Sequence, residues 1–260
     1  MNLHDFFSSL GNFAVFRNRN KQGQLVSMHQ SGTHWLKHIL AMALTKHYEL
    51  PAPEFNHSND IIGGPRDPVI YSELPNLVSS HSIPHPSLKL NFVHSFFRLP
   101  PYVVLVRDIR RSLISNYFKW KNSYNVSFKV FLRGAQSQRF NSDVWWTINF
   151  INQWGLLAKN NPNKIIVVRY EDLQKDGLNQ VLKICKHWNL KLTIEEIIYG
   201  INQSQKSIMI KKDDPSRPKG AVNNSNIGLE LFDYSDRNFF EKICKKNLKI
   251  DLGYSYNNWD

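Results

Sequence analysis

The sequence predicts an α/β domain in which a central parallel β-sheet is flanked by helices. Two continuous apolar runs, Val103–Val106 and Ile165–Val168, are typical of strands that are covered on both faces. The segments between the expected strands carry apolar residues at helical spacing. A chain of 260 residues with 42% hydrophobic and 21% charged residues suits a single domain that spans residues 1–260.

The expected strands and helices alternate along the chain. Strands are expected at Gln24–Met28, Leu77–Ser80, Tyr102–Val106 and Lys164–Arg169. Helical stripes are formed by Trp35, Ile39, Leu40 and Ala43; by Leu113, Tyr117 and Trp120; by Trp146, Phe150, Ile151 and Trp154; and by Val181, Ile184, Cys185 and Trp188. This alternation favours a parallel sheet, which binds ligands at the carboxyl ends of its strands.

The charge of the chain indicates an anionic ligand. Lys and Arg number 33 against 21 Asp and Glu, which gives a formal net charge of +12. A nucleotide, a sulfated product, a polyanion or an acidic surface would all suit this excess, and so would a basic, solvated surface with no specific partner.

Cysteine content and the first residues indicate a cytoplasmic setting. Cys185 and Cys244 are the two cysteines, too few for a disulfide framework. Asp5, Arg17 and Arg19 interrupt the first 25 residues, so we expect no secretory signal. Apolar runs as short as Tyr102–Val106 do not reach the roughly 18 residues that a membrane span needs, and we expect none.

The first expected strand leads into a turn that suits an anion. The segment His29–Trp35 reads HQSGTHW, and the helix begins within it. Small residues at Ser31 and Gly32 let the backbone curl so that amide N–H groups face an anion at the positive end of the helix, and Thr33 adds a hydroxyl. The triphosphatase loop G-x-x-x-x-G-K-[ST] is absent from the sequence. Taken alone, the segment is equally well explained as an ordinary helix cap.

Two later strand ends carry polar residues. Arg107 follows the third strand, and Ser115 comes eight positions later on the next helix. The planar guanidinium donates two hydrogen bonds to a phosphate, and a nearby hydroxyl completes the cradle; the alternative for Arg107 is a surface salt bridge. Tyr170–Leu173, which reads YEDL, follows the fourth strand and by itself is an acidic helix cap.

In this order the three segments resemble the cytosolic-type sulfotransferases that use 3′-phosphoadenosine 5′-phosphosulfate (PAPS). Their P-K-S-G-T-T-W loop is matched at Ser31, Gly32, Thr33 and Trp35, whereas Gln30 stands at the lysine and His34 at the second threonine. The resemblance implies a P-loop NTPase-like fold. It also implies that the donor's 5′-phosphosulfate and adenine are bound by Gln30, Ser31, Gly32, Thr33, His34 and Trp35.

The same resemblance assigns the rest of the nucleotide site. It implies that Arg107 and Ser115 bind the 3′-phosphate and that Tyr170 contacts the nucleotide. The segment 217–224 is similar to the family's R-K-G-x-x-G-x-W loop without its second glycine and tryptophan. It implies a loop that closes over the nucleotide through Arg217, Lys219 and Gly220.

The resemblance also indicates a catalytic base. The segment Leu74–His81 resembles the family's P-R-I-x-K-T-H, which ends in the catalytic histidine. A histidine at a strand end is placed to accept a proton near neutral pH, so His81 is the expected base. Glu73 is the alternative, because some sulfotransferases of the wider superfamily use glutamate.

Gln30 is the main departure from the family at the catalytic centre. The lysine that it replaces helps to stabilise the leaving group in the family, so Gln30 is counted among the catalytic positions. Sulfuryl transfer builds negative charge on the leaving nucleotide, which needs preorganised donors. Either a nearby cation such as Lys37 or His34 replaces the lysine, or turnover is slow.

The expected function is sulfuryl transfer from PAPS to a hydroxyl or amine of a small-molecule or glycan acceptor, without a metal. The expected partners are this nucleotide donor and the acceptor, and nucleic acid is not among them. One alternative is a nucleotide-kinase-like phosphotransferase, which predicts Mg²⁺-dependent binding of ATP. The other is a non-catalytic basic module that binds nucleotide or polyanion and has lost turnover with Gln30. A zinc site at His34 and His38 lacks an evident third ligand in the sequence.

Overall fold

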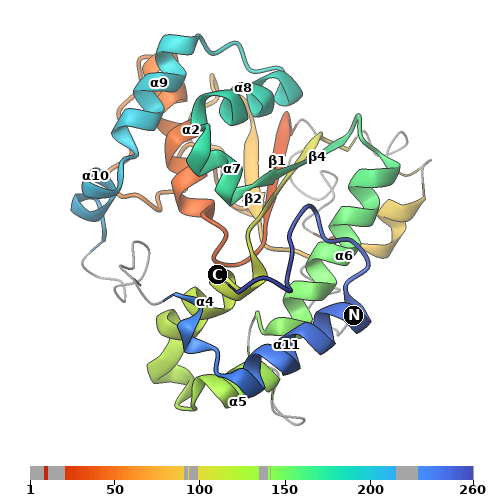
Figure 1. The fold of residues 1–260 in the computed structure, drawn as a ribbon. Helices are drawn as coiled ribbons and strands as arrows, with labels where there is room; N and C mark the ends of the chain where they lie inside the picture. Colours follow the sequence, from red (N-terminus) through yellow and green to blue (C-terminus); the bar gives the residue numbers. More distant parts are fainter. Residues whose placement is uncertain are drawn as a thin grey trace.

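A parallel sheet lies at the centre of the protein. The computed structural model describes residues 9–10, 21–90, 93, 99–134, 140, 142–214 and 228–259. The described residues form a four-stranded sheet in the order β2-β1-β3-β4, and all three pairings are parallel (Figure 1). Its strands are β1 (Gly23–Ser27), β2 (Leu77–Ser80), β3 (Tyr102–Val106) and β4 (Ile165–Arg169). The predicted strands and their parallel arrangement are confirmed, with ends that differ by one residue at β1 and β4.

Helices follow the strands along the chain. The α-helices of the described residues are α2 (Thr33–His47), α4 (Ile109–Tyr124), α5 (Phe128–Arg133), α6 (Val144–Asn160), α7 (Tyr170–Lys175), α8 (Gly177–Trp188), α9 (Ile194–Gln203), α10 (Lys206–Lys211) and α11 (Tyr234–Asn247). Short 3₁₀ turns occur at η3 (Pro86–Lys89) and η4 (Leu229–Leu231). Because α2, α4 and α7 begin just after β1, β3 and β4, their N-termini lie at the carboxyl edge of the sheet.

The two faces of the sheet are covered by different helices. Tyr102, Val104 and Val106 of β3 pack into a core with residues of α4, α5, α6 and α11. Val103 and Leu105, which alternate with them, pack into a second core with α2, α8 and α9. Figure 1 shows the two helical layers on opposite sides of the strands. This double cover explains why the strands are continuously apolar.

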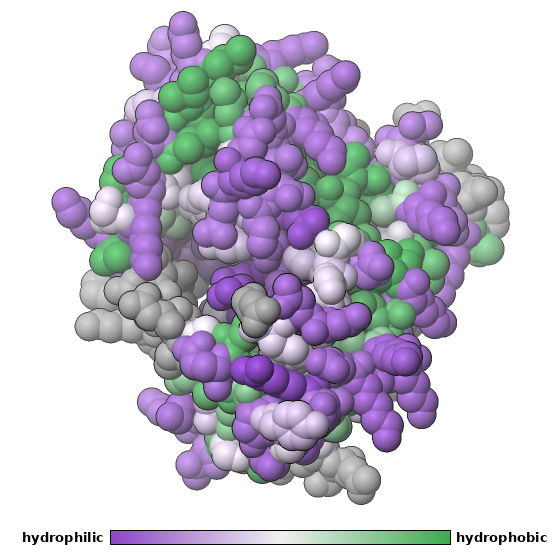
Figure 2. All heavy atoms as spheres, viewed as in Figure 1, coloured by the Kyte–Doolittle hydropathy of each residue, from purple (hydrophilic) through white to green (hydrophobic). Residues whose placement is uncertain are grey.

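The face of the protein in Figure 2 carries both polar and apolar side chains. Polar side chains cover most of the face in Figure 2, and apolar side chains gather over α8 and α9, where Ile194 is 55% and Ile198 41% exposed. In α4, Leu113 and Tyr117 are buried while Trp120 is 39% exposed, so the apolar stripe ends one turn earlier than the sequence indicates. Among the described helices none has the length and apolar character that a membrane span requires.

Two neighbouring leucines of α6 test which side of this helix packs into the core that it shares with α4, α5 and α11. Leu157 is 3% exposed and Leu156 is 37% exposed. We expect Leu157→Ala to lower the free energy of unfolding by about 2–5 kcal/mol, since it removes buried methyl groups and leaves a cavity. Leu156→Ala, the matched control, should change it by about 1 kcal/mol or less. Urea denaturation measures both, and equal losses would contradict this placement of α6.

Candidate functional site

The turn between β1 and α2 has a backbone that only glycine accommodates. Gly32, the N-cap residue of α2, has a left-handed φ of +90°. A Cβ atom there would lie 2.5 Å from the ring of Tyr170. The hydroxyls of Ser31 and Thr33 do not cap the helix, because Ser31 Oγ donates to the carbonyl of Met28 and Thr33 Oγ1 donates to Ser27 Oγ. The N-terminus of α2 therefore remains available to an anion.

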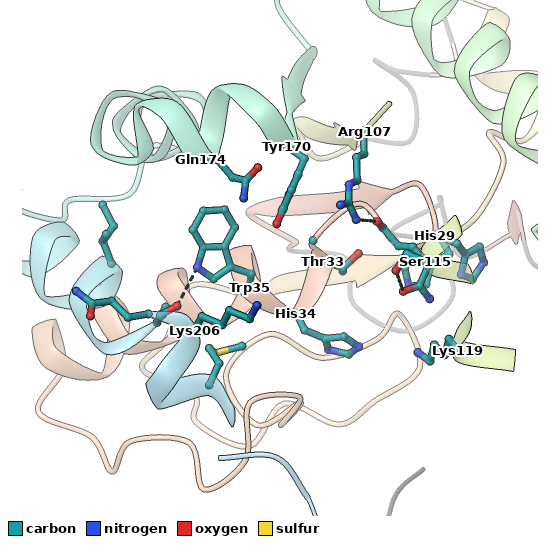
Figure 3. Close-up of a pocket in the computed structure, with 17 residues that line it drawn as sticks. His29, Thr33, His34, Trp35, Arg107, Ser115, Lys119, Tyr170, Gln174 and Lys206 are labelled. Carbon is teal, nitrogen blue, oxygen red and sulfur yellow. Dashed lines mark hydrogen bonds between the residues drawn. The ribbon is translucent and has the colours of Figure 1, made fainter. Parts of the chain in front are cut away.

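A cavity of about 430 Å³ opens over this turn. Its walls come from the turn after β1 and from residues just beyond β2, β3 and β4, together with α4, α9 and α10 (Figure 3). Nine of the sequence-predicted residues line it: Gln30, Gly32, Thr33, His34, Trp35, His81, Arg107, Ser115 and Tyr170. The cavity therefore joins segments that lie far apart in the sequence.

Two of the other predicted residues, Ser31 and Glu73, do not line this cavity. Ser31 is a fully buried residue of the turn. Glu73 is exposed and does not face the cavity, so its position does not suit a base. Arg217, Lys219 and Gly220 lie outside the described residues.

Arg107 and Ser115 are both attached to the turn through Gln30. Arg107 Nη1 donates to the backbone oxygen of Gln30 at 3.0 Å, and Ser115 Oγ donates to its side-chain Oε1 at 3.3 Å (Figure 3). The guanidinium also lies 4.5 Å from the centroid of the Tyr170 ring. Arg107 Nε is buried and has no hydrogen-bond partner among the described residues. Arg107 lines the cavity, and its guanidinium carries more N–H donors than the bond to Gln30 uses, so the arrangement suits a phosphate.

Aromatic side chains form the opposite end of the cavity. Trp35 Nε1 donates to the backbone oxygen of Ser204 at 2.9 Å. Its ring meets that of Tyr170 edge to face, with 5.7 Å between centroids. Gln174 and Lys206 lie near them (Figure 3). This end offers flat apolar surface with polar groups at its border, which suits a nucleobase.

His81 is held in one tautomer. Its Nδ1 lies 2.8 Å from the backbone oxygen of Ser27, and a carbonyl only accepts, so Nδ1 carries the proton and Nε2 is free to take one. Burial lowers the pKa of His81 below its ordinary 6.5, the bond to Ser27 opposes this, and the charges of Lys119 and Lys37 add to the lowering. The imidazole is therefore neutral at pH 7 and competent as a base.

His29 packs directly on His81, a contact that the sequence did not predict. The two rings are stacked with 4.1 Å between centroids and an interplanar angle of 17°. The other neighbour of His29 is Trp146, at 4.7 Å. Burial lowers the pKa of His29 well below 6.5, with His81 and Lys119 contributing. Both stacked imidazoles are therefore neutral.

The cations expected to replace the missing lysine are not suited to that role. Burial lowers the pKa of His34 to about 3, so this ring is neutral at pH 7. Burial also lowers the pKa of Lys37 to about 8. Its ammonium donates to Asn59 Oδ1 at 2.7 Å, and Lys37 does not line the cavity.

Among the residues that the structure describes, the cations that line the cavity are Arg107, Lys119 and Lys206. None of the described lining residues is Asp or Glu. The cavity therefore carries a positive potential that suits a polyanionic ligand. Lys119 was missed, although its position four residues after Ser115 on α4 places the two side chains on one helix face.

The two histidines considered for zinc do not form a metal site. His38 Nδ1 contacts Ser204 Oγ at 2.7 Å, whereas His34 faces the cavity. Within the described part of the chain, no group of three or more His, Cys, Asp or Glu side chains is arranged to hold a metal ion.

Sequence comparisons agree with the resemblance noted above. The model of the sulfotransferase domain family matches residues 21–250. Sulfotransferase 2A6 from Mus musculus is 30% identical over 181 residues, which cover 65% of this chain and 59% of that protein. The 3-alpha-hydroxysteroid sulfotransferase of Cavia porcellus is 29% identical over 184 residues, which cover 66% of this chain and 60% of that protein. Sulfotransferase 2A1 from Mus musculus is 30% identical over 246 residues, covering 84% and 81%.

Solved structures share the fold. A complex of mouse sulfotransferase SULT7A1 with PAP superposes with a TM-score of 0.65 at 16% identity, covering 97% of this chain and 92% of that one. Retinol dehydratase, in complex with androsterone and the inactive cofactor PAP, superposes with a TM-score of 0.64 at 17% identity. The superposition covers 96% of this chain and 88% of that one. These similarities confirm the predicted α/β, P-loop-like fold class.

Proposed function

The chain belongs to the sulfotransferase domain family, and from this premise we propose that it transfers a sulfuryl group from PAPS to a hydroxyl or amine of a small-molecule acceptor. The observation that carries the proposal is the cavity at the carboxyl ends of the strands. It combines an uncapped helix N-terminus, the pair Arg107 and Ser115, and the neutral His81. A hydroxysteroid is one candidate acceptor, because a relative from Cavia porcellus is named for that substrate class.

The residues of the cavity suit the parts of this donor. We assign the 3′-phosphate to Arg107 and Ser115, which both line the cavity and both contact Gln30 of the turn. The N–H groups around Gly32 suit the 5′-phosphosulfate. Trp35 and Tyr170 suit the adenine. A volume of about 430 Å³ lies within the usual range for ligand cavities.

His81 is the proposed base. When bound, the donor supplies an activated sulfuryl group, and the acceptor oxygen or nitrogen must lose a proton as it attacks. His81 Nε2 takes that proton, while the carbonyl of Ser27 holds the opposite nitrogen and orients the ring. The ring of His29, stacked on the face of His81, restricts the rotation of that imidazole about its side-chain bonds.

The two alternatives have less support. A kinase-type phosphotransferase holds Mg²⁺ through carboxylates, and none of the described residues that line the cavity is acidic. A binding module without turnover would not need a histidine whose tautomer and neutral charge suit proton transfer. Catalysis of sulfuryl transfer therefore fits the residues better than either alternative.

We place this activity in the cytoplasm. Cys185 and Cys244 are both free and buried, as expected in a reducing compartment. Burial raises the pKa of each thiol to about 12, so neither is a reactive thiolate.

Removal of Arg107 tests the 3′-phosphate site. We expect Arg107→Ala to weaken binding of adenosine 3′,5′-bisphosphate by about 1.5–3 kcal/mol, the usual cost of a lost charged hydrogen bond. Arg111→Ala, at an exposed position of α4, is the matched control and should bind normally. Isothermal titration calorimetry measures both affinities, and equal affinities of the two variants would refute this assignment.

Replacement of His81 tests the base. We expect His81→Gln to lower kcat by about 10²–10⁴-fold, with bisphosphate affinity close to that of the wild type. Radiolabelled PAPS with 2-naphthol as the acceptor measures the rate, and His47→Gln, at a residue that does not line the cavity, serves as control.

The pH profile of the wild type adds a second readout for His81. Because burial lowers its pKa, kcat/KM should be level near pH 7 and fall only below pH 6.5, where the imidazole becomes protonated. A fall of kcat/KM that begins above pH 7 as the pH is lowered, or full activity in His81→Gln, would contradict the assignment.

A further inference from the structure

The reacting end of the cavity needs a positive charge that its turn does not provide. In the proposed reaction, on which this inference rests, the S–O bond of the donor breaks and its electron pair stays on the bridging oxygen, which becomes an oxygen of the 5′-phosphate. Preorganised donors at that atom lower the barrier strongly. Gln30 is neutral, and so is the His29 imidazole beside it in the turn.

Three cations line the cavity among the described residues, and their positions differ. Arg107 is held by the backbone of Gln30 and the ring of Tyr170. Lys206 lies near Trp35, at the end of the cavity that suits the nucleobase (Figure 3). Lys119 lies at the other end, with Ser115 and His29 (Figure 3).

Two further observations place Lys119, which lines the cavity, near the turn and the proposed base His81. Its charge lowers the pKa of His29, His34 and His81, so it acts on all three imidazoles around the turn. Ser115, one helical turn earlier on α4, reaches Gln30 Oε1 at 3.3 Å. Because side chains at positions i and i+4 are neighbours on a helix, Lys119 approaches the same region next to that contact.

We propose that Lys119 is a catalytic residue whose ammonium donates a hydrogen bond to the bridging oxygen of the donor. The new S–O bond forms to the acceptor oxygen, the old S–O bond breaks with its electron pair on the bridging oxygen, and the acceptor proton passes to His81. Lys119 stabilises the charge that appears on the leaving bisphosphate. The cation thus comes from α4 and compensates for the neutral Gln30 of the turn.

Moving the charge tests this role by turnover. We expect Lys119→Met, which keeps an unbranched side chain, to lower kcat by about 10²–10³-fold, the typical effect of removing one such donor. The double variant Gln30→Lys, Lys119→Met should recover most of that loss, because it returns a cation to the same oxygen from the turn. Lys121→Met, at an exposed position on the same helix, is the control and should keep wild-type turnover. The assay follows radiolabelled PAPS with 2-naphthol, androsterone and water as acceptors.

Binding of two nucleotides tests the same contact without turnover. In adenosine 3′,5′-bisphosphate the former bridging oxygen is part of the 5′-phosphate, whereas adenosine 3′-monophosphate lacks it. We expect Lys119→Met to lower the affinity for the bisphosphate by about tenfold or more and to leave the affinity for the monophosphate unchanged. The double variant should restore the bisphosphate affinity. Arg107→Ala should instead weaken both nucleotides.

The outcomes separate the inference from the proposed function. Wild-type kcat in Lys119→Met, or an increase only in the KM for the acceptor, would overturn the role of Lys119 while sulfuryl transfer stands. An equal loss of affinity for both nucleotides would also overturn it, because the contact would then not be to the 5′-phosphate. A wild-type chain that transfers sulfate to none of the three acceptors would overturn the proposed function, and the nucleotide comparison would still decide whether Lys119 faces the 5′-phosphate.

Discussion

The close approach of Gly32 to the ring of Tyr170 determines how the cavity is built. A Cβ on Gly32 would lie 2.5 Å from that ring, so the turn after β1 and the start of α7 meet only at a glycine. The guanidinium of Arg107 lies 4.5 Å from the centre of the same ring. One aromatic side chain therefore joins the ends of β1, β3 and β4, and the N-terminus of α2 opens into the space between them.

The electrostatics of the cavity follow from this arrangement. Its histidines are neutral because they are desolvated and lie near lysines. Its permanent charges are cationic, and none of the described lining residues balances them. The proposed donor carries two phosphoryl-type groups, whose negative charge balances these cations. The cavity thus has the charge and the donors for a polyanion, and a neutral imidazole for proton transfer.

Much of this architecture was predictable because its causes are local. The runs in β3 and β4 are continuously apolar since helices cover both faces of the sheet. Parallel strands end at one edge, so Ser31–Trp35, Arg107 and Tyr170 were expected to meet there. The turn required glycine for its backbone, and that requirement is visible in the sequence.

The remaining features depend on tertiary placement. Glu73 and His81 belong to one segment, yet only His81 lies at a strand end that faces the cavity. Lys37 lies one helical turn beyond Thr33, but its ammonium is buried against Asn59. The stack of His29 on His81 joins the residues that follow β1 and β2, and Lys119 lines the cavity from α4, so no single segment determines either feature.

The central claim is that the cavity recognises a nucleotide by a phosphate at its 3′ position. Calorimetric titration of the wild-type chain with adenosine 3′,5′-bisphosphate and with ADP, both without magnesium, tests it most directly. We expect tight binding of the bisphosphate and much weaker binding of ADP, because Arg107 and Ser115 are assigned to the 3′-phosphate. Equal affinity for the two nucleotides, or no binding of either, would contradict it.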